Sequence, residues 1–204
     1  MSGKVAPWIP TPVSVVYAAL EAAWAGPCDV VYDLGSGDGR AVVIAARDFC
    51  VKKAVGVELD LVLVELSKAK ARMDGVADRV EIVEDDFFRV SLRGATLVYI
   101  YLYMSINEKL RPKLEEELRP GARVVTIDFP VPGWTPVYTR RLRDENDILR
   151  TVHVYVIGVS DQRWTRLGTR LEEPGPELEA LAHCTRDPPP GCRPRRGPRA
   201  GSRP

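Results

Sequence analysis

Apolar residues along this chain follow two spacings, one typical of helices and one typical of buried strands. In the segment 13–24 they recur three and four positions apart, at Val16, Leu20 and Ala23, which predicts an amphipathic helix. The segment 95–102 is instead apolar at nearly every position, which is typical of a parallel strand covered on both faces. The two spacings together indicate a mixed α/β domain.

Strands and helices are predicted to alternate along most of the chain. The expected helices span Val13–Trp24, Gly39–Phe49, Leu61–Met73 and Ser105–Leu118. The expected strands span Asp29–Leu34, Ala54–Leu59, Val80–Val83, Ala95–Leu102, Ala122–Phe129, Val137–Leu142 and Arg150–Ile157. We expect Thr11 to cap the first helix, with Pro12 at the first helical position. We expect Ser105 to cap the fourth helix. This order predicts a doubly wound α/β sheet with an antiparallel edge hairpin.

A glycine-rich segment follows the first predicted strand, within the stretch Val30–Arg40. Its glycines at 35, 37 and 39 let the backbone turn tightly and let a ligand approach the main chain. A dinucleotide-binding loop would read G-x-G-x-x-G, whereas this loop reads G-x-G-x-G, with Asp33 before it and Asp38 inside it. Because carboxylates repel phosphates, we interpret the loop as a site for S-adenosylmethionine (SAM), which has a cationic end.

Acidic residues end the next two predicted strands. Glu58 lies 19 residues after Gly39, where an acid accepts hydrogen bonds from ribose hydroxyls. Asp85-Asp86-Phe87 follows the third strand, where a carboxylate can accept from the adenine amine and Phe87 can pack or offer its backbone amide. These residues would bind the ribose and adenine ends of SAM.

Three tyrosines mark the end of the fourth predicted strand. Tyr99, Tyr101 and Tyr103 are two positions apart and therefore share one side of the sheet. Nucleic-acid amino-methyltransferases usually place an Asn/Asp-Pro-Pro-aromatic turn here, and this chain lacks it. We expect Tyr99 in the core, Tyr101 in the core or against the cofactor, and Tyr103 at the rim of the ligand crevice.

Composition narrows the function classes. The chain has 204 residues and is 45% hydrophobic, enough for the core of one domain. Its apolar runs are too short to span a bilayer and its first residues lack a signal-peptide pattern, so we expect a soluble, cytoplasmic protein without membrane partners. Residues 1–160 contain 20 Lys and Arg against 22 Asp and Glu, so they lack the basic excess typical of nucleic-acid binding.

Cysteine spacing and amide content give two further expectations. Cys28, Cys50, Cys184 and Cys192 show no C-x-x-C spacing, and the chain has two histidines, so we expect no metal site and reduced thiols. Only two Asn and one Gln occur, which is typical of proteins from hot environments and also of GC-biased coding.

Composition changes near residue 160. We expect an N-terminal segment and helix over 1–28 and a SAM-binding domain over 29–159. Residues 160–204 should form a disordered tail, because Pro, Gly and Arg cannot build a core. The basic tail could contact nucleic acid or acidic surfaces, although a solvated, dispensable tail is favoured.

Taken together, these residues resemble a known family. Asp33–Arg40, Glu58 and Asp86-Phe87 resemble class I SAM-dependent methyltransferases. The similarity narrows to the archaeal broad-specificity protein-lysine methyltransferases, relatives of the mitochondrial enzymes that methylate the ATP synthase c subunit and the adenine nucleotide translocase. It covers about residues 5–158 and is found in the segments IPTP (9–12), VYDLGSGDGR (31–40), VKKAVGVE (51–58), NEKLRPKLEEEL (107–118), RPGARVV (119–125), Asp128-Phe129 and 154–158.

The resemblance implies a seven-stranded Rossmann-like fold and methyl transfer to exposed lysines of many proteins by a monomer. The cofactor contacts it implies, with Ser36 and Tyr101 added as neighbours of the pocket, are Thr11, Asp33, Gly35, Ser36, Gly37, Glu58, Asp86, Phe87 and Tyr101. The substrate-binding candidates are Trp8, Tyr103, Asn107, Asp128 and Trp134.

The chain also departs from this family. Trp8 replaces the usual Tyr before x-P-T-P, and 126–129 replaces the sequence S-H-acid-F. Arg150 and His153 stand where the family tends to have His and Tyr, and the Arg/Pro tail is extra. The first three departures lie on the expected substrate side, so they affect substrate choice more than chemistry.

The expected reaction is an in-line displacement at the SAM methyl group by a neutral lysine amine. Free lysine has a pKa of about 10.4, so neutralising it at pH 7 costs roughly 4–5 kcal/mol. We expect a desolvating aromatic channel of Tyr103 and Trp134 to lower that pKa, and Asn107 to orient the amine. We assign no general base; His153 qualifies only if it faces the crevice, and a strand-surface position is favoured for it.

Two other functions remain open on the sequence. The same fold can methylate RNA or a small molecule, although the missing N-P-P turn and the acidic folded part argue against nucleic acid. A SAM-fold module that only binds its ligand is the other alternative, and the retained set Asp33, Gly35, Gly37 and Glu58 argues against it.

Overall fold

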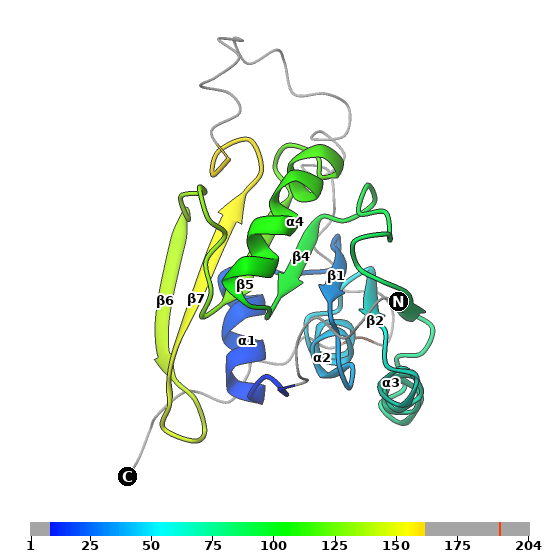
Figure 1. The fold of residues 1–204 in the computed structure, drawn as a ribbon. Coiled ribbons are helices and arrows are strands. Elements are labelled where there is room, and N and C mark those ends of the chain that lie inside the picture. Colours follow the sequence, from blue (N-terminus) through cyan, green and yellow to red (C-terminus); the bar gives the residue numbers. More distant parts are fainter. Residues whose placement is uncertain (1–8, 162–191, 193–204) are drawn as a thin grey trace.

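The computed structural model describes residues 9–161 and Cys192. It contains one seven-stranded sheet, in the order β3-β2-β1-β4-β5-β7-β6, with helices packed on its faces (Figure 1). The helices are α1 (Val13–Ala22), α2 (Arg40–Asp48), α3 (Leu61–Met73) and α4 (Met104–Glu117). The strands are β1 (Val30–Leu34), β2 (Lys53–Glu58), β3 (Val80–Glu84), β4 (Leu97–Ile100), β5 (Arg123–Ile127), β6 (Tyr138–Arg143) and β7 (Leu149–Val156).

The strand order has a switch point between β1 and β4, because the chain extends the sheet through β2 and β3 on one side and then through β4 and β5 on the other. Strands β1 to β5 are parallel, whereas β7 is antiparallel to β5 and β6 is antiparallel to β7. Strand β1 lies between β2 and β4, with Asp33 in register with Gly56 on one side and Tyr99 on the other. The loops after β1 and β4 therefore diverge from neighbouring strand ends, where open α/β sheets bind their ligands.

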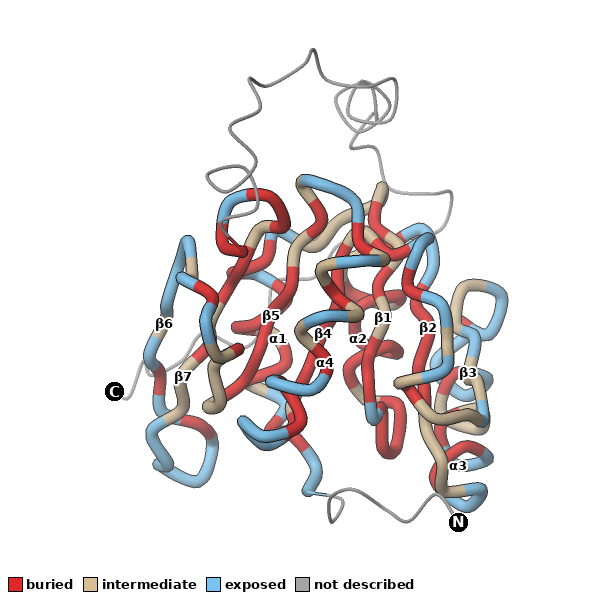
Figure 2. Tube along the Cα trace, turned by 45° about the horizontal axis from the view of Figure 1, so that its top comes forward, coloured by how far each residue is buried: buried red, intermediate tan, exposed pale blue. Residues whose placement is uncertain are grey.

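Two hydrophobic clusters hold helices to the two faces of the sheet. On one face, α1 and α2 bury residues such as Leu20 and Val42 against the strands, and α3 adds Ala71. On the other face, α4 buries Leu110 and Leu114 together with strand residues and with the loop that follows β3. Figure 2 shows the buried segments concentrated along the strands, with exposed segments at the loops and outer helix faces.

All seven predicted strands and four predicted helices are confirmed, but the predicted helix caps are wrong. Pro12 occupies the N-cap of α1 without a side-chain cap, and Tyr103 does so at α4. The free N–H of Val13 instead donates to the Glu145 carboxylate at 2.8 Å. A residue in the β6–β7 turn thus replaces the local cap, which a sequence pattern cannot anticipate.

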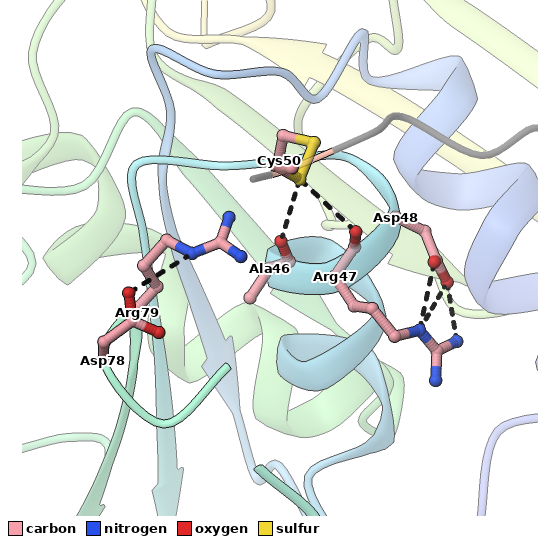
Figure 3. The surroundings of a disulfide bond; sticks show 7 residues. Ala46, Arg47, Asp48, Cys50, Asp78 and Arg79 are labelled. Atoms are coloured by element: carbon pink, nitrogen blue, oxygen red, sulfur yellow. Dashed lines mark hydrogen bonds and ion pairs between the residues drawn. A yellow bond between two sulfur atoms is a disulfide. The ribbon is translucent and has the colours of Figure 1, made fainter. Parts of the chain in front are cut away.

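The cysteines also differ from expectation. Cys50, which is fully buried just after α2, forms a disulfide with Cys192, and the two Cα atoms are 5.8 Å apart (Figure 3). Cys28 is disulfide-bonded as well. Reduced thiols were the wrong prediction for these residues because absent C-x-x-C spacing argues against metal sites, not against pairs distant in sequence. Disulfides do occur in intracellular proteins of hyperthermophiles, in keeping with the scarcity of Asn and Gln.

The described residues contain neither a membrane-spanning helix nor a cluster of metal-ligating side chains. No helix there is long and apolar enough to span a bilayer, and no group of three or more His, Cys, Asp or Glu side chains in that part of the chain is placed to hold a metal ion. The predicted disordered tail lies outside the described residues, apart from its first two positions and Cys192.

Candidate active site

A pocket lies at the carboxyl ends of β1 and β4, beside the segment that precedes α1. It combines the glycine loop with the I-P-T-P segment and two strand-end tyrosines. Its lining residues are Ile9, Pro10, Thr11, Asp33, Gly35, Ser36, Gly37, Asp38, Arg40, Ala41, Tyr99 and Tyr101. Six of the nine predicted cofactor residues, from Thr11 to Tyr101, therefore meet in one place.

The backbone of the glycine loop has a conformation that would be strained for residues other than glycine. Gly35, Gly37 and Gly39 all have positive φ, at 81°, 56° and 75°. A Cβ on Gly39 would lie 2.7 Å from the Ser67 side chain of α3, whose hydroxyl donates to the Gly37 carbonyl at 2.9 Å. The loop thus needs glycine both for its conformation and for its close contact with α3.

Asp33 provides a buried carboxyl group to the pocket. Its side chain is 4% exposed, and within the described part of the chain we find no hydrogen bond or ion pair to its carboxylate. Burial raises the pKa of Asp33 to about 8, and the neighbouring acids Glu58 and Asp38 add to the effect. A carboxylate in this state fits a cationic ligand, because a bound positive charge would stabilise its ionised form.

Glu58 is fixed by three backbone amides at the end of β2. One carboxylate oxygen accepts from Gly37 N at 2.9 Å, and the other accepts from Leu59 N at 2.8 Å and Asp60 N at 2.9 Å. An ionised carboxylate has about four acceptor positions, so one remains for a ligand hydroxyl. The buried Ser36 hydroxyl, which lines the pocket, has no hydrogen-bond partner among the described residues. Both features fit a ligand rich in polar groups, as SAM is.

The predicted adenine-side residues form a tight turn after β3. The Asp86 carboxylate accepts from Phe88 N at 2.9 Å, and Asp86 N donates to Asp85 at 2.7 Å. Phe87 is 7% exposed and packs into the α4-side cluster, with its ring centroid 4.9 Å from that of Phe88. This turn orders Asp86 beside the end of β2.

The sequence analysis interpreted Asp38 as a carboxylate that faces the ligand, but in the structure its partners are side chains of the protein. Arg40 donates to it from Nε at 2.9 Å and from Nη2 at 2.8 Å, and Lys70 of α3 also pairs with it. The hydrogen bonds and charges of these two cations outweigh burial and lower the pKa of Asp38 to about 2. Its charge is therefore neutralised within the protein, and Asp33 is the pocket carboxylate left for a cation.

Arg40 also connects the glycine loop to the N-terminal segment. Its Nη1 donates to the Thr11 carbonyl at 2.8 Å, and Thr11 is 8% exposed. This bond holds the I-P-T-P segment against the pocket. The predicted substrate residue Trp8 lies outside the described residues.

Tyr103 and Asn107 lie at the start of α4. The Tyr103 side chain is 41% exposed, and its ring meets the Phe129 ring edge-on at 5.5 Å. Asn107 is fully buried and donates to the Phe129 carbonyl at 2.9 Å, while its Oδ1 has no partner among the described residues. The pair therefore orders the turn after β5 beside an exposed aromatic ring.

Trp134 lies in the core. It is 7% exposed, donates from Nε1 to Glu115 of α4 at 2.8 Å and packs edge-on against Tyr155 at 5.5 Å. It belongs to the cluster on the α4 face, whereas Tyr101 packs against the cluster on the opposite face. We therefore leave Trp134 out of the substrate site proposed below.

Asp128 joins a network that connects three strand ends. Its carboxylate accepts from Thr151 N and from Arg150 Nη1, both at 2.9 Å. Arg150 Nε donates to Asp144, whose side chain is fully buried, at 2.9 Å, and Arg150 Nη1 donates to the Tyr101 hydroxyl at 3.0 Å. Arg150 and Asp144 were missed as site residues because only the fold brings Arg150 to Tyr101 and Asp144 to Arg150. The departure at Arg150 was the single signal.

His153 sits in the middle of β7, in register with Thr126 and Thr139 on the neighbouring strands. It is half-buried, and burial lowers its pKa. It is not among the residues that line the pocket, so we assign it no catalytic role.

Known proteins resemble this chain in both sequence and structure. Residues 33–138 match the ANTKMT methyltransferase domain. A protein-lysine N-methyltransferase of Saccharolobus islandicus is 46% identical over 152 residues, which cover 74% of this chain and 94% of the relative. The mouse adenine nucleotide translocase lysine N-methyltransferase is 43% identical over 105 residues, covering 52% of this chain and 45% of the relative.

A solved structure adds the ligand. A Salinibacter ruber protein described as an RNA methyltransferase, crystallised with S-adenosyl-L-homocysteine, superimposes with a TM-score of 0.68 at 44% identity, covering 73% of this chain and 94% of its own. S-adenosyl-L-homocysteine is what SAM becomes when it loses its methyl group, in keeping with the cation-seeking Asp33 and the polar pocket. The chain therefore belongs to the ANTKMT methyltransferase family and is a SAM-dependent methyltransferase.

Proposed function

We propose that this protein transfers methyl groups to lysine side-chain amines of proteins, with a broad substrate range. The observation that carries the proposal is the 46% identity to the archaeal protein-lysine N-methyltransferase, which extends over 94% of that enzyme. The matched stretch of 152 residues is much longer than a cofactor loop with its neighbouring strands. A generic cofactor-binding similarity would be confined to the glycine loop and its neighbouring strands.

The pocket and the ends of the two neighbouring strands β2 and β3 suit SAM in distinct ways. Asp33 would balance the positive charge of the methionine end, Glu58 would accept from the ribose, and Asp86 would lie toward the adenine. SAM supplies the methyl group: the lysine nitrogen bonds to its carbon as the carbon–sulfur bond breaks, the electron pair stays on sulfur, and the methylated nitrogen loses its proton to water.

The substrate side would serve the amine by desolvation. Tyr103 and Phe129 form an aromatic pair after β4 and β5, and Asn107 fixes the turn that holds Phe129. In this proposal the pair borders the path of the lysine side chain. An apolar, aromatic entrance lowers the pKa of an incoming lysine because it disfavours the ammonium form. Phe129 thus takes the place that the sequence assigned to Trp134, and positioning rather than a dedicated base would account for the rate.

RNA methylation is the second candidate, because the Salinibacter ruber protein at 44% identity is described as an RNA methyltransferase. Against it, residues 1–160 contain more acidic than basic residues, and the turn after β4 lacks Asn/Asp-Pro-Pro. A phosphate backbone needs basic side chains for binding, and these residues do not offer an excess of them.

Labelled SAM separates the candidates. The purified protein would be incubated with SAM labelled with tritium in its methyl group. Three separate reactions would contain the proteins, the RNA or the metabolites extracted from one cell culture. We expect label in protein, recovered after hydrolysis as methyl-lysine, and none in RNA. Label in RNA alone would overturn the proposal, and no label in any pool would favour a module that only binds SAM. Asp33→Asn serves as the inactive control.

A further inference from the structure

We infer that Tyr101 contacts the target amine as a hydrogen-bond acceptor, and that Arg150 positions its hydroxyl for this role. The inference rests on the proposed lysine methylation and goes beyond it, because it names the group that aims the nucleophile. Tyr101 is the first residue after β4 and lines the cofactor pocket. A residue there lies between the cofactor loop and the substrate side.

The hydroxyl of Tyr101 has fixed partners. Arg150 Nη1 donates to it at 3.0 Å, and the Asp128 carboxylate lies 3.4 Å away as the acceptor for its proton. Arg150 donates only, and both Asp128 oxygens already accept, from Thr151 N and from Arg150 Nη1, so the two roles cannot be exchanged. A phenol oxygen has one proton and two acceptor positions, so this arrangement leaves a single acceptor position open.

An acceptor is what a methyl-accepting amine requires. The reactive neutral amine has one lone pair, and a hydroxyl that donated to it would occupy the electrons that must attack the methyl carbon. A hydroxyl whose proton is committed to Asp128 can only accept an N–H of the amine. That contact leaves the lone pair free and fixes its direction, which is the positioning that the reaction needs.

Arg150 keeps this arrangement in place from three sides. It binds Asp128 at the end of β5, Asp144 at the end of β6 and Tyr101 after β4. The Arg150 and Asp128 side chains are only 16% and 22% exposed, and the Asp144 side chain is fully buried. The Asp128 oxygen that accepts from Arg150 is also the oxygen that accepts from the Tyr101 hydroxyl, which directs the Tyr101 proton away from the substrate.

The methylation state of the substrate gives a test that a merely structural role would fail. Neutral lysine carries two N–H groups, neutral monomethyl-lysine carries one, and neutral dimethyl-lysine carries none. An acceptor can therefore assist the first and second transfers but has no hydrogen to accept in the third. Damage to folding or to cofactor binding would slow all three transfers alike.

The experiment compares Tyr101→Phe with the wild type on three synthetic peptides that contain lysine, monomethyl-lysine or dimethyl-lysine. We expect the rate at saturating SAM to fall about 10- to 100-fold on the first two peptides and less than about 2-fold on the third. Tyr138→Phe removes a hydroxyl from an exposed tyrosine on β6 and is the matched control. The melting temperature and the SAM dissociation constant of both variants, measured by calorimetry, separate a loss of folding or of cofactor binding from the loss of rate.

Arg150→Lys tests the positioning role, because lysine keeps one charge but cannot bind three partners in the same geometry. We expect the same pattern over the three peptides as for Tyr101→Phe, with a smaller loss. In the Tyr101→Phe background the Arg150 substitution should add less than about a twofold loss, because it acts through the missing hydroxyl.

The outcomes separate this inference from the proposed function. If the wild type methylates none of the peptides and no lysine in the protein pool, both fail. If it methylates them but Tyr101→Phe keeps rates within twofold, or loses the same factor on all three, the inference alone fails. If the wild type stops at dimethyl-lysine, that result supports Tyr101 as the acceptor. The effect of Tyr101→Phe on the lysine and monomethyl-lysine rates then tests the inference. Independent losses from Arg150→Lys and Tyr101→Phe would overturn the positioning role.

Discussion

The proposed cofactor side and the proposed substrate side of the candidate active site differ in how far apart in the chain their partners lie. On the cofactor side, Asp33, Gly37 and Glu58 come from two consecutive strand–loop–helix units, and the Glu58 carboxylate binds amides beside it and in the preceding loop. On the substrate side, Tyr101, Asp128 and Arg150 come from three strands and meet only when β7 returns antiparallel to β5.

This difference affects how each side handles charge. Asp33 has no cation beside it among the described residues, so its ionised form is disfavoured until a positive ligand binds. On the substrate side Arg150 already pairs with Asp128 and Asp144, so a neutral amine would meet balanced charges. A methyltransferase for amines needs this contrast, because its cofactor is a cation and its reactive nucleophile is neutral.

The largest expected effect concerns the stability that both sides share. Cys50→Ser removes a disulfide between residues 142 positions apart, and for a loop of that size the chain-entropy estimate is about 5 kcal/mol of unfolding free energy. Because both sides belong to one sheet, we expect a single transition at lower denaturant concentration. Urea unfolding measured by circular dichroism tests this.

Cys192→Ser is the matched control for the disulfide, since it breaks the same bond from the other end and should cost the same free energy. SAM affinity at 25 °C should stay unchanged in both variants, because Cys50 is not among the residues that line the pocket. Equal unfolding curves for wild type and variants would show that the bond stabilises neither side.

Asp33→Asn removes the carboxylate that we expect to pair with the positive charge of SAM. We expect SAM affinity to fall about 100-fold, since a charge-assisted contact in a buried pocket is lost. The ligand-free variant should melt at a higher temperature than the wild type at pH 9, because the wild type then buries an unpaired charge. Calorimetric titration and thermal unfolding measure the two effects.

Asp78→Asn is a suitable control, because the Asp78 side chain is 75% exposed and should affect neither quantity. Unchanged SAM affinity in Asp33→Asn would remove the physical basis for the cofactor assignment.

The pH dependence of SAM binding sharpens the same point. With its pKa raised to about 8, Asp33 is protonated in the ligand-free protein at pH 6, and a bound cation would drive that proton off. Affinity should therefore rise about tenfold per pH unit from pH 6 toward 8. Above pH 8 it should fall, because an α-amino group loses its charge near a pKa of about 7.7–8.0.

The stability of the ligand-free protein should fall over the same pH range in which the affinity for SAM rises. Because the pKa of Asp33 is higher in the folded state, the stability of the ligand-free protein that depends on it is present below about pH 4 and lost as pH rises through 8. The stabilisation by SAM should accordingly grow between pH 6 and 8. A flat affinity profile, or one identical to that of Asp33→Asn, would contradict the prediction.

The same contrast explains what could be predicted from the sequence. The cofactor side follows local rules: a strand, a turn that needs positive φ at Gly35 and Gly39, and an acid at the next strand end. The seven strands were predictable for the same reason, because apolar spacing reports burial along a single segment. Only small shifts of the element ends separate expectation from structure.

The residues that the sequence placed poorly all depend on tertiary contacts. Asp38 looked like a ligand carboxylate, but Arg40 and Lys70 neutralise it after α3 packs on the loop. Glu145 caps α1 from the β6–β7 turn, and Trp134 packs toward α4 instead of the rim. None of these pairings has a spacing rule, so an unaligned sequence gives no way to find them.

The smallest expected effect concerns the segment that lies over the pocket. Arg40→Gln removes the hydrogen bond from Arg40 to the Thr11 carbonyl, and one hydrogen bond of this kind contributes about 1–2 kcal/mol. We expect SAM affinity to fall about 5- to 20-fold, because the I-P-T-P segment would no longer be held against the pocket. Lys70→Gln is the matched control: it also takes a cation from Asp38 but does not touch Thr11. If the tether matters, Arg40→Gln should weaken SAM binding well beyond Lys70→Gln. Equal losses would mean that the charge on Asp38, and not the N-terminal segment, sets the affinity.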